Sequence, residues 1–276
     1  MPELPEVEVC AQYISKQLLD ASLFKVTTSQ LSLRKPIPKT REFYPLYHQT
    51  LKTVSRHGKY LLLNFSSKTI IIHLGMSGTV RIEFKVNKKN HDHCIFSFTK
   101  AQNLLHLIYN DPRRFGMISL EGSDALPSLS KLGPDLFNQT QCHPRYLFSK
   151  AQKTSVAIKT FLLDQTIVAG VGNIYACEAL FTSNIHPATS AQNLSLVQLQ
   201  TLTKALTTIM KRAIRKGGSS IRTFTNPEGT LGYFSFSHQV YDRAAQPCTM
   251  CHTAIEVFTQ ASRSTYYCPH CQPMLM

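Results

Sequence analysis

The first residues of the chain combine a potential amine nucleophile with two carboxylates. The segment reads Pro2-Glu3-Leu4-Pro5-Glu6. Because proline is small, removal of Met1 by an aminopeptidase would leave Pro2 with a free secondary amine. An α-amine is less basic than a lysine side chain, so more of it is uncharged and nucleophilic at neutral pH. Its condensation with an aldehyde would give a cationic iminium, a strong electron sink, and Glu3 and Glu6 could move protons beside it.

The same segment also has the features of a helix start. Pro5 suits the first turn of a helix, and Glu3 and Glu6 complement the positive end of the helix dipole. Apolar residues then recur at helical spacing as far as about Asp20, at Val7, Cys10, Ala11, Ile14 and Leu18. Both interpretations hold together, since a helix that begins here would fix the position of the N-terminal residues.

A second group of residues with chemical potential lies near the other end of the chain. Cys248 and Cys251 form one C-x2-C pair, and Cys268 and Cys271 form another after sixteen intervening residues. This spacing predicts one structural zinc ion per chain, bound by four thiolates. Two disulfides or a redox pair are the alternatives. Because the acidic N-terminus lacks the basic-then-apolar order of a secretory signal, we expect a cytoplasmic protein and favour zinc.

The segment between the two cysteine pairs has room for a β-hairpin. Ala254–Phe258 and Ser264–Tyr267 would form its strands, and Arg263 would lie near its tip. The other four cysteines stand singly in apolar contexts, where we expect buried thiols. They are Cys10, Cys94, Cys142 and Cys177.

The charge balance points to a polyanionic partner. The 276 residues include 30 Lys and Arg against 16 Asp and Glu, a formal net charge of +14. Nucleic acid is the commonest partner of such a chain, and an anionic membrane surface is the alternative. No apolar stretch is long enough to cross a bilayer. The length is sufficient for two domains with cores of their own.

The order of predicted elements defines the fold class. Short β-rich segments occupy the first half of the chain, at Phe24–Thr28, Leu51–Arg56, Tyr60–Phe65, Thr69–His73, Thr79–Phe84, Cys94–Phe98, Leu104–Tyr109 and Met117–Leu120. After a linker at Glu121–Pro134, the pattern becomes helical, at Ser155–Leu163, Gly172–Phe181 and Leu196–Arg215. Strands, then helices, then a metal module predict an α+β multidomain protein, with a sandwich or barrel first.

Two turns carry side chains suited to a distorted duplex. His73–Gly78 follows a strand, and Met76 stands where an apolar side chain could project. Asp111–Gly116 places two arginines beside Phe115, the combination of cations and an apolar wedge that a duplex-bending protein uses. Ordinary packing of Met76 and Phe115 in a core is the alternative for each turn.

Three further features are weaker when taken singly. Val171–Tyr175 opens a helix, where Gly172 allows close approach and Asn173 could add a donor to a phosphate or simply cap the helix. Lys59 could meet a phosphate or remain solvated. The tract His91-Asp92-His93 superficially suggests a metal cluster, but we favour a turn that enters a strand because no third ligand is signalled nearby.

Taken together, these motifs resemble those of bacterial formamidopyrimidine-DNA glycosylase, in the order in which that family carries them. The matching pieces span nearly the whole chain: Pro2–Glu8, Lys59–Leu61, Ile71–Gly78, His91–His93, Asp111–Gly116, Leu132–Pro134, Val171–Tyr175, Gly217–Gly218, Gly232–Phe234, Val240–Tyr241 and the four cysteines.

The resemblance implies an N-terminal β-sandwich with a nucleophile-bearing helix, then a helix–two-turns–helix domain with a C-terminal zinc-finger β-hairpin. The corresponding domains are residues 1–125, 126–245 and 246–276, with DNA in the cleft between the two larger ones. The implied activity is bifunctional: base-excision removal of oxidised purines (8-oxoguanine, formamidopyrimidines) and β,δ-elimination at abasic sites through a Schiff base on the N-terminal proline. The implied partner is double-stranded DNA containing such lesions, with no membrane, and we expect a monomer.

The resemblance also implies roles for individual residues. Pro2 would be the nucleophile, Glu3 the acid and base at the sugar, and Glu6 a supporting carboxylate. Lys59, Asn173 and Arg263 would contact phosphates around the flipped nucleotide, with Lys59 and Arg263 counted in the catalytic group. The expected DNA-binding residues are His93, Met76, Arg113, Arg114, Phe115 and Asn173. Of these, Met76, Arg113 and Phe115 would fill the gap that the nucleotide leaves, and the segment after Gly217-Gly218 would recognise the lesion.

Some positions depart from the family pattern. His57 stands where arginine is frequent, and Asp242 stands where glycine is usual. The recognition segment Ser219–Leu231 is generic in its residues. An endonuclease VIII-like glycosylase for oxidised pyrimidines is the nearest alternative, although Leu4 favours the purine enzyme. A non-catalytic zinc-hairpin DNA-binding protein would explain the charge and the cysteines, but not Pro2 with Glu3.

Overall fold

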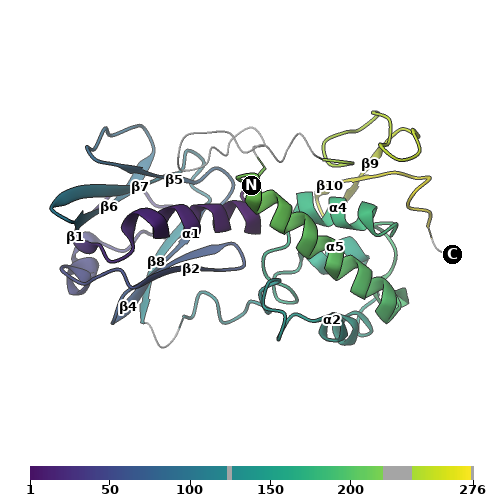
Figure 1. Ribbon diagram of the computed structural model, residues 1–276, viewed down its shortest axis with the longest axis horizontal. Coiled ribbons are helices and arrows are strands. Elements are labelled where there is room, and N and C mark those ends of the chain that lie inside the picture. The colour runs from purple at the N-terminus through teal and green to yellow at the C-terminus, as the bar shows by residue number, and fades with distance from the viewer. Residues whose placement is uncertain (123–125, 220–237, 275–276) are drawn as a thin grey trace. The chain divides into compact units, whose positions relative to one another are not determined.

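In the computed structural model the chain forms two compact units. The structure describes residues 1–122, 126–219 and 238–274 (Figure 1). The first unit comprises Met1–Lys131 together with Lys216–Tyr233, and the second comprises Leu132–Arg215 and Phe234–Met276. No helix in these described ranges is both long enough and apolar enough to cross a lipid bilayer.

The first unit is a sandwich of two antiparallel four-stranded sheets. One sheet has the order β1-β6-β7-β5 and the other β2-β3-β4-β8. The strands are β1 (Ser22–Thr28), β2 (Thr53–His57), β3 (Tyr60–Asn64), β4 (Lys68–His73), β5 (Thr79–Glu83), β6 (Asp92–Lys100), β7 (Asn103–Asn110) and β8 (Met117–Gly122). Every predicted strand is present, with ends shifted by one or two residues.

One continuous core joins the two sheets to the first helix. Phe96, Leu107 and Tyr109 of one sheet share it with Leu61 and Ile72 of the other. Helix α1 (Leu4–Leu18) packs against β2 and β3 and runs along the sandwich, with labelled strands on either side of it (Figure 1). Its buried face is the predicted one: Val7, Cys10, Ala11, Ile14 and Leu18. The short 3-10 helix η1 (Thr40–Leu46) was not predicted, because its sequence is interrupted by Pro45.

The second unit is mainly helical. Its elements are α2 (Pro144–Ala151), α3 (Ile158–Leu163), α4 (Asn173–Thr182), the 3-10 helix η2 (Ala191–Asn193) and α5 (Leu196–Arg215), followed by β9 (Glu256–Gln260) and β10 (Arg263–Tyr267). The predicted bounds of α5 are those observed. Helix α2 was not predicted, and it begins with Pro144 after His143, whose ring nitrogen caps it.

The C-terminal hairpin packs with the helices rather than forming a compact unit of its own. A small core joins Cys177 and Phe181 of α4 to Val240, Ile255 and Cys268. The residues on either side of the predicted boundary at residue 246 therefore belong to the same compact unit, although they form different parts of the sequence. The predicted linker is consistent with the observed boundary between Lys131 and Leu132.

Candidate active site

The N-terminal residues are fixed by the start of α1. Pro2, Glu3 and Glu6 are buried, whereas Met1 is 40% exposed. Glu3 is the N-cap residue, and it forms a capping box with Glu6: each side chain accepts from the other residue's backbone N–H. The Glu3 N–H donates to Glu6 Oε2 at 2.8 Å. The residues that begin the helix are therefore the same residues that carry the predicted amine and carboxylates.

The carboxylate of Glu6 also holds a distant part of the first unit. The Ser219 N–H donates to Glu6 Oε1 at 2.8 Å. Before Ser219, Gly217 and Gly218 have φ values of 77° and 86°, which favour glycine over other residues. The double glycine thus ends α5 and lets the chain return to the N-terminus of α1. The predicted recognition segment continues from there, and beyond Ser219 it lies outside the described residues.

Lys59 lies in the tight turn between β2 and β3. Gly58 has a φ of 56°, and the flanking residues His57 and Tyr60 pair across the turn. Lys59 is buried, with only 6% of its surface exposed, so it is not a solvated cation at the tip of the turn. Its charge acts on the neighbouring His73, whose pKa is lowered to about 3 by burial, by Arg34 and by Lys59.

The neutral ring of His73 organises the next loop. Its Nδ1 accepts a hydrogen bond from the Gly75 N–H at 3.0 Å, which a protonated imidazole could not do. This bond fixes the backbone immediately before Met76, whose side chain is 39% exposed. The prediction that an apolar side chain projects from this loop is consistent with that exposure.

The turn Asp111–Gly116 exposes the predicted cation and aromatic side by side. Arg113 and Arg114 are exposed, and Phe115 is 47% exposed. The Arg113 guanidinium lies 5.2 Å from the centre of the Phe115 ring, within the range of a cation–π contact. An exposed aromatic ring with a cation against it is not part of a core, so ordinary packing does not explain Phe115.

A buried carboxylate joins this turn to the loop that carries Met76. Asp111 is fully buried, and its Oδ1 accepts from Ser77 Oγ at 2.6 Å. Its Oδ2 accepts from the Gly116 N–H at 2.8 Å and from the Tyr109 hydroxyl at 3.2 Å. Ser77 Oγ in turn accepts from the Arg113 N–H at 3.2 Å. Asp111 and Ser77 therefore hold both loops in one arrangement, a role that the sequence did not reveal.

Close backbone contact makes this arrangement specific to glycine. A Cβ atom on Gly75 would lie 2.5 Å from the Gly116 nitrogen and from the Phe115 carbonyl carbon. A Cβ on Gly116 would overlap the Tyr109 hydroxyl. The two loops could not approach as they do if either glycine were another residue.

The expected DNA contact at His93 is not supported by its position. The His93 side chain is completely buried, its Nε2 is 3.0 Å from the Asp111 carbonyl oxygen and its Nδ1 is 3.1 Å from Ser29 Oγ. With both nitrogens engaged inside the protein, the ring supports the turn rather than facing a ligand. His91, two residues earlier, is the exposed histidine of this tract and has a φ of 69°.

In the second unit, Asn173 and Arg263 are brought together through the hairpin. Asn173 begins α4 after Gly172, and its Nδ2 donates to the Ser264 carbonyl at 2.9 Å. Arg263 is exposed, begins β10 and pairs with Gln260 across the hairpin tip, as predicted. Because Ser264 follows Arg263 directly, this bond places the two predicted phosphate-contacting residues on adjacent elements.

Buried Lys159 is a further residue that positions the hairpin. Its Nζ donates to the Ser264 carbonyl at 3.1 Å and to Thr265 Oγ1 at 2.8 Å, although it lies in the apolar helix α3. The sequence signal that could have revealed this role is a lysine within an apolar helical segment, because a lysine is seldom buried unless its charge has partners. The hairpin backbone beside Arg263 is thus held by both α3 and α4.

The departure at Asp242 has a structural explanation. Asp242 has a φ of 59°, a conformation that glycine adopts readily and that aspartate tolerates better than most residues. Just before it, the N–H groups of Gln239, Val240 and Tyr241 donate to the Glu178 carboxylate at 2.9 to 3.0 Å. Burial raises the pKa of Glu178, while these three bonds oppose that shift.

The four C-terminal cysteines form one metal site. Their sulfur atoms all lie within 4.8 Å of one another, and three of the Sγ–Sγ distances are 3.4, 3.5 and 3.9 Å. A tetrahedral site with Zn–S bonds of about 2.3 Å requires separations of about 3.8 Å. None of the eight cysteines forms a disulfide, so the disulfide alternative fails, and the cluster of four thiols fits one structural zinc ion.

We expect Cys268→Ser, or strong chelation, to unfold the hairpin and weaken DNA binding while the first unit stays folded. Ligand binding and folding are coupled at such sites, and apparent zinc binding energies in zinc-finger peptides are about 10–16 kcal/mol. Metal analysis with DNA binding checks this expectation. Cys142→Ala, which removes a thiol outside the cluster, should keep one zinc per chain. Full activity in protein with substoichiometric zinc would refute the site.

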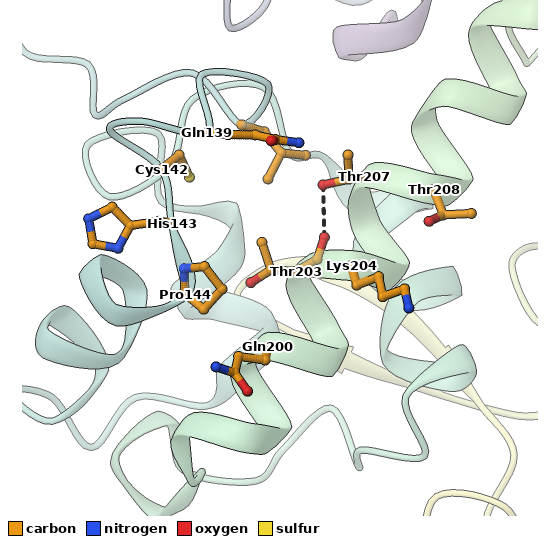
Figure 2. Close-up of a pocket in the computed structure, with 10 residues that line it drawn as sticks. Gln139, Cys142, His143, Pro144, Gln200, Thr203, Lys204, Thr207 and Thr208 are labelled. Atoms are coloured by element: carbon orange, nitrogen blue, oxygen red, sulfur yellow. Dashed lines mark hydrogen bonds between the residues drawn. The ribbon is translucent and has the colours of Figure 1, made fainter.

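A separate cavity of about 360 Å³ in the second unit contains none of the predicted site residues (Figure 2). Gln139, Cys142 and His143 line one side, and Gln200 and Lys204 of α5 line another. Cys142 and His143 lie beside each other in its lining, but burial raises the pKa of the Cys142 thiol to about 12, so this thiol is a poor nucleophile and we do not assign the reaction to the cavity.

Family comparisons agree with the fold and with the four-cysteine metal site. Three family models match in chain order: the formamidopyrimidine-DNA glycosylase N-terminal domain over residues 1–118, its H2TH domain over residues 132–225, and a zinc finger found in FPG and IleRS over residues 245–273. The H2TH match covers helices α2 to α5 of the second unit, in agreement with the predicted helix–two-turns–helix domain.

Whole-chain similarity extends the comparison to individual proteins. The formamidopyrimidine-DNA glycosylase of Psychromonas ingrahamii is 41% identical over 275 residues, covering 99% of this chain and all of the relative. That of Legionella pneumophila is 39% identical and covers all of both chains. Lactococcus lactis Fpg bound to abasic-site DNA superposes with a TM-score of 0.88 at 31% identity, over 99% of this chain and all of the other. The same protein bound to Fapy-dG DNA gives a TM-score of 0.86 at 31% identity, over 98% of this chain and all of the other. This chain therefore belongs to the formamidopyrimidine-DNA glycosylase family.

Proposed function

We propose that this base-excision DNA glycosylase removes oxidised purines from duplex DNA and then cleaves the abasic site through its N-terminal proline. The observation that carries the proposal is the buried start of α1, where Pro2 directly precedes the N-cap Glu3. The Lactococcus lactis relative was captured with abasic-site and Fapy-dG DNA, which supports the substrate class. We also infer a cytoplasmic location, where a bacterial chromosome lies.

The first chemical step is displacement of the damaged base. After Met1 is removed, the Pro2 nitrogen attacks C1′ of the flipped nucleotide, and the bond from C1′ to the base nitrogen breaks with its electrons leaving on the base. Glu3 serves as acid and base at the sugar, so that the ring opens and a cationic iminium forms between Pro2 and C1′.

The iminium then drives the two strand cleavages. It draws electrons from C2′, so loss of a C2′ proton expels the 3′ phosphate, and a second elimination expels the 5′ phosphate. Hydrolysis of the remaining iminium frees Pro2. Zinc takes no part in bond breaking, because four thiolates fill its coordination sphere.

The other groups act on binding and extrusion. Lys59 and, in the second unit, Asn173 and Arg263 hold phosphates beside the extruded nucleotide. Extrusion costs a few kcal/mol, and Met76, Phe115 and Arg113 offset that cost by occupying the emptied stack. We propose that exposed His91 replaces buried His93 as the DNA contact of its tract, and that Arg114 contacts the backbone beside Arg113.

Cleavage of matched duplexes tests the proposed substrate class. We expect excision of 8-oxoguanine to exceed that of dihydrouracil when the duplexes are otherwise identical. Preferential excision of dihydrouracil would support the endonuclease VIII-like alternative. Binding of both duplexes without any cleavage, by protein shown by mass to begin at Pro2, would support the non-catalytic alternative.

We expect Arg113→Ala to relax discrimination by the base opposite the lesion, with little change in the salt dependence of binding. The physical reason is the position of its guanidinium over the Phe115 ring, where it would face the orphaned base rather than a phosphate. Phe115→Ala should instead slow extrusion, since an aromatic filler is worth about 1–3 kcal/mol. Affinity measured at several salt concentrations with each opposite base checks the first expectation, and the rate of single-turnover excision checks the second. A salt slope reduced by about one unit, with unchanged base preference, would make Arg113 a phosphate clamp only.

A further inference from the structure

The loop that joins β5 to β6 carries an unusual concentration of positive charge. Residues 84–91 include Lys85, Lys88 and Lys89 and no carboxylate, and every residue of the loop is exposed. The two flanking carboxylates, Glu83 and Asp92, form ion pairs with Arg81. The Arg81 Nε–Glu83 Oε1 and Arg81 NH1–Asp92 Oδ1 distances are both 2.7 Å.

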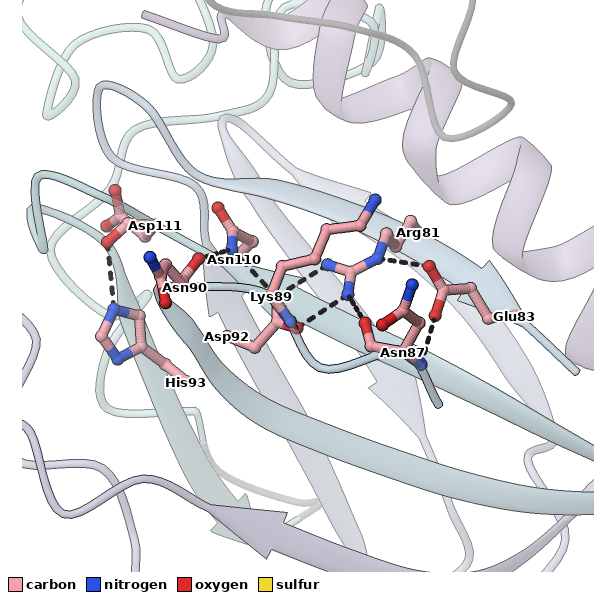
Figure 3. Close-up of polar contacts among 9 residues, drawn as sticks. All are labelled: Arg81, Glu83, Asn87, Lys89, Asn90, Asp92, His93, Asn110 and Asp111. Carbon is pink, nitrogen blue, oxygen red and sulfur yellow. Dashed lines mark hydrogen bonds and ion pairs between the residues drawn. The ribbon is translucent and has the colours of Figure 1, made fainter. Parts of the chain in front are cut away.

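The same Arg81 group fixes the loop backbone (Figure 3). Arg81 donates to the Asn87 carbonyl at 3.3 Å, and the Asn87 N–H donates to Glu83 Oε2 at 3.3 Å. The Lys89 N–H donates to Asp92 Oδ2 at 2.7 Å. The pKa values of Glu83 and Asp92 are lowered by these bonds, against the effect of burial, so both remain ionised at neutral pH. The loop is therefore an ordered platform rather than a loose charged segment.

One end of this platform is continuous with the turn that fills the emptied stack. The Asp111 N–H donates to the His91 carbonyl at 3.1 Å. Beside it, Asn110 Nδ2 donates to the Asn90 carbonyl at 2.8 Å (Figure 3). Register confirms the neighbourhood, because Asp92 pairs with Asn110, the residue before Asp111. The lysine loop and the exposed Arg113 and Phe115 thus belong to one edge of the first unit.

We propose that Lys85, Lys88 and Lys89 form a second phosphate-binding segment, which holds the duplex backbone beyond the extruded nucleotide. This inference rests on the proposed function, since it places the loop beside the groups that enter the stack. Net positive charge, an ordered backbone and continuity with that turn favour a phosphate backbone as the occupant. Phe84 is 74% exposed and would also suit a protein partner, and the experiment separates the two.

The test is the salt dependence of binding to an undamaged duplex by the triple variant Lys85→Gln, Lys88→Gln and Lys89→Gln. Glutamine removes the charge and retains the Lys89 backbone bond to Asp92. Each phosphate contact contributes about 0.9 to the slope of log affinity against log salt, so we expect its magnitude to fall by about two to three. A fall in the slope magnitude of one unit or more supports the proposal. Any smaller change overturns it and favours a protein as the partner of the loop.

A matched control uses three exposed lysines elsewhere on the same unit: Lys16 in α1, Lys25 in β1 and Lys52 before β2. Lys25 lies in the edge strand opposite β5 in the same sheet. Their triple replacement by glutamine should leave the slope within one unit of wild type, and an equal fall in the control would also overturn the assignment to the loop. Excision by wild-type protein, assayed in parallel, reports on the proposed function separately, because binding to undamaged DNA requires no chemistry.

Discussion

Retention of Met1, or any tag before Pro2, is expected to abolish covalent trapping on abasic DNA while DNA binding persists. With Met1 attached, the Pro2 nitrogen belongs to a peptide bond, and its lone pair is delocalised into the carbonyl. It can neither attack C1′ nor form an iminium. The phosphate contacts assigned to Lys59, Asn173 and Arg263 do not involve this nitrogen, so affinity should remain.

The comparison requires protein whose first residue is verified by mass. A cleavable N-terminal tag provides the matched pair, since the tagged form should be inert and removal that leaves Pro2 first should restore trapping with borohydride. A C-terminal tag serves as the control for the presence of a tag. Efficient trapping by protein shown by mass to retain Met1 would contradict the assignment of Pro2 as the nucleophile.

Glu3→Gln is expected to reduce base excision by about 10²–10⁴-fold, the usual contribution of a positioned acid or base, with near-normal lesion affinity. Glutamine keeps the shape of the side chain and an acceptor oxygen for the Glu6 N–H, so the capping box at the start of α1 survives. What is lost is the ionisable proton. Single-turnover excision and equilibrium binding, measured on the same lesion duplex, separate these effects.

Glu42→Gln is a closely matched control for this substitution. Glu42 also forms a capping box, in which its Oε1 accepts from the Lys39 N–H at 2.6 Å, but it lies in η1 and is exposed. It should leave excision and thermal unfolding near wild type. A large loss of affinity in Glu3→Gln, with normal excision of DNA that is bound, would contradict the acid and base role.

Much of this architecture follows from local sequence pattern. The face of α1 follows from apolar spacing, and the strands follow from short β-rich runs separated by turns, so both were predictable before any tertiary contact was known. The cysteine spacing likewise determined the metal site, because each C-x2-C turn places two sulfurs together. The position of Arg263 then followed from the hairpin that joins the two pairs.

The supporting residues could not be predicted, because they act across long separations in sequence. Ser77 and Asp111 are 34 positions apart, and Lys159 is bonded to Thr265 on another element. Neither pair leaves a periodic signal. The burial of His93 was not predictable for a related reason: a motif gives the residue types of a turn, whereas the tertiary structure decides which of its histidines is exposed.

Mapping the protein–DNA bond most directly tests the central claim that the N-terminal proline is the nucleophile. Protein that begins at Pro2 would be trapped with borohydride on abasic DNA, digested, and analysed by mass spectrometry. We predict that the nucleotide remnant is attached to the Pro2 nitrogen in the N-terminal peptide. Lys59 is the competing amine of the same unit, buried in the turn before β3. A remnant on Lys59, or on any other lysine, with an unmodified N-terminus would contradict the account.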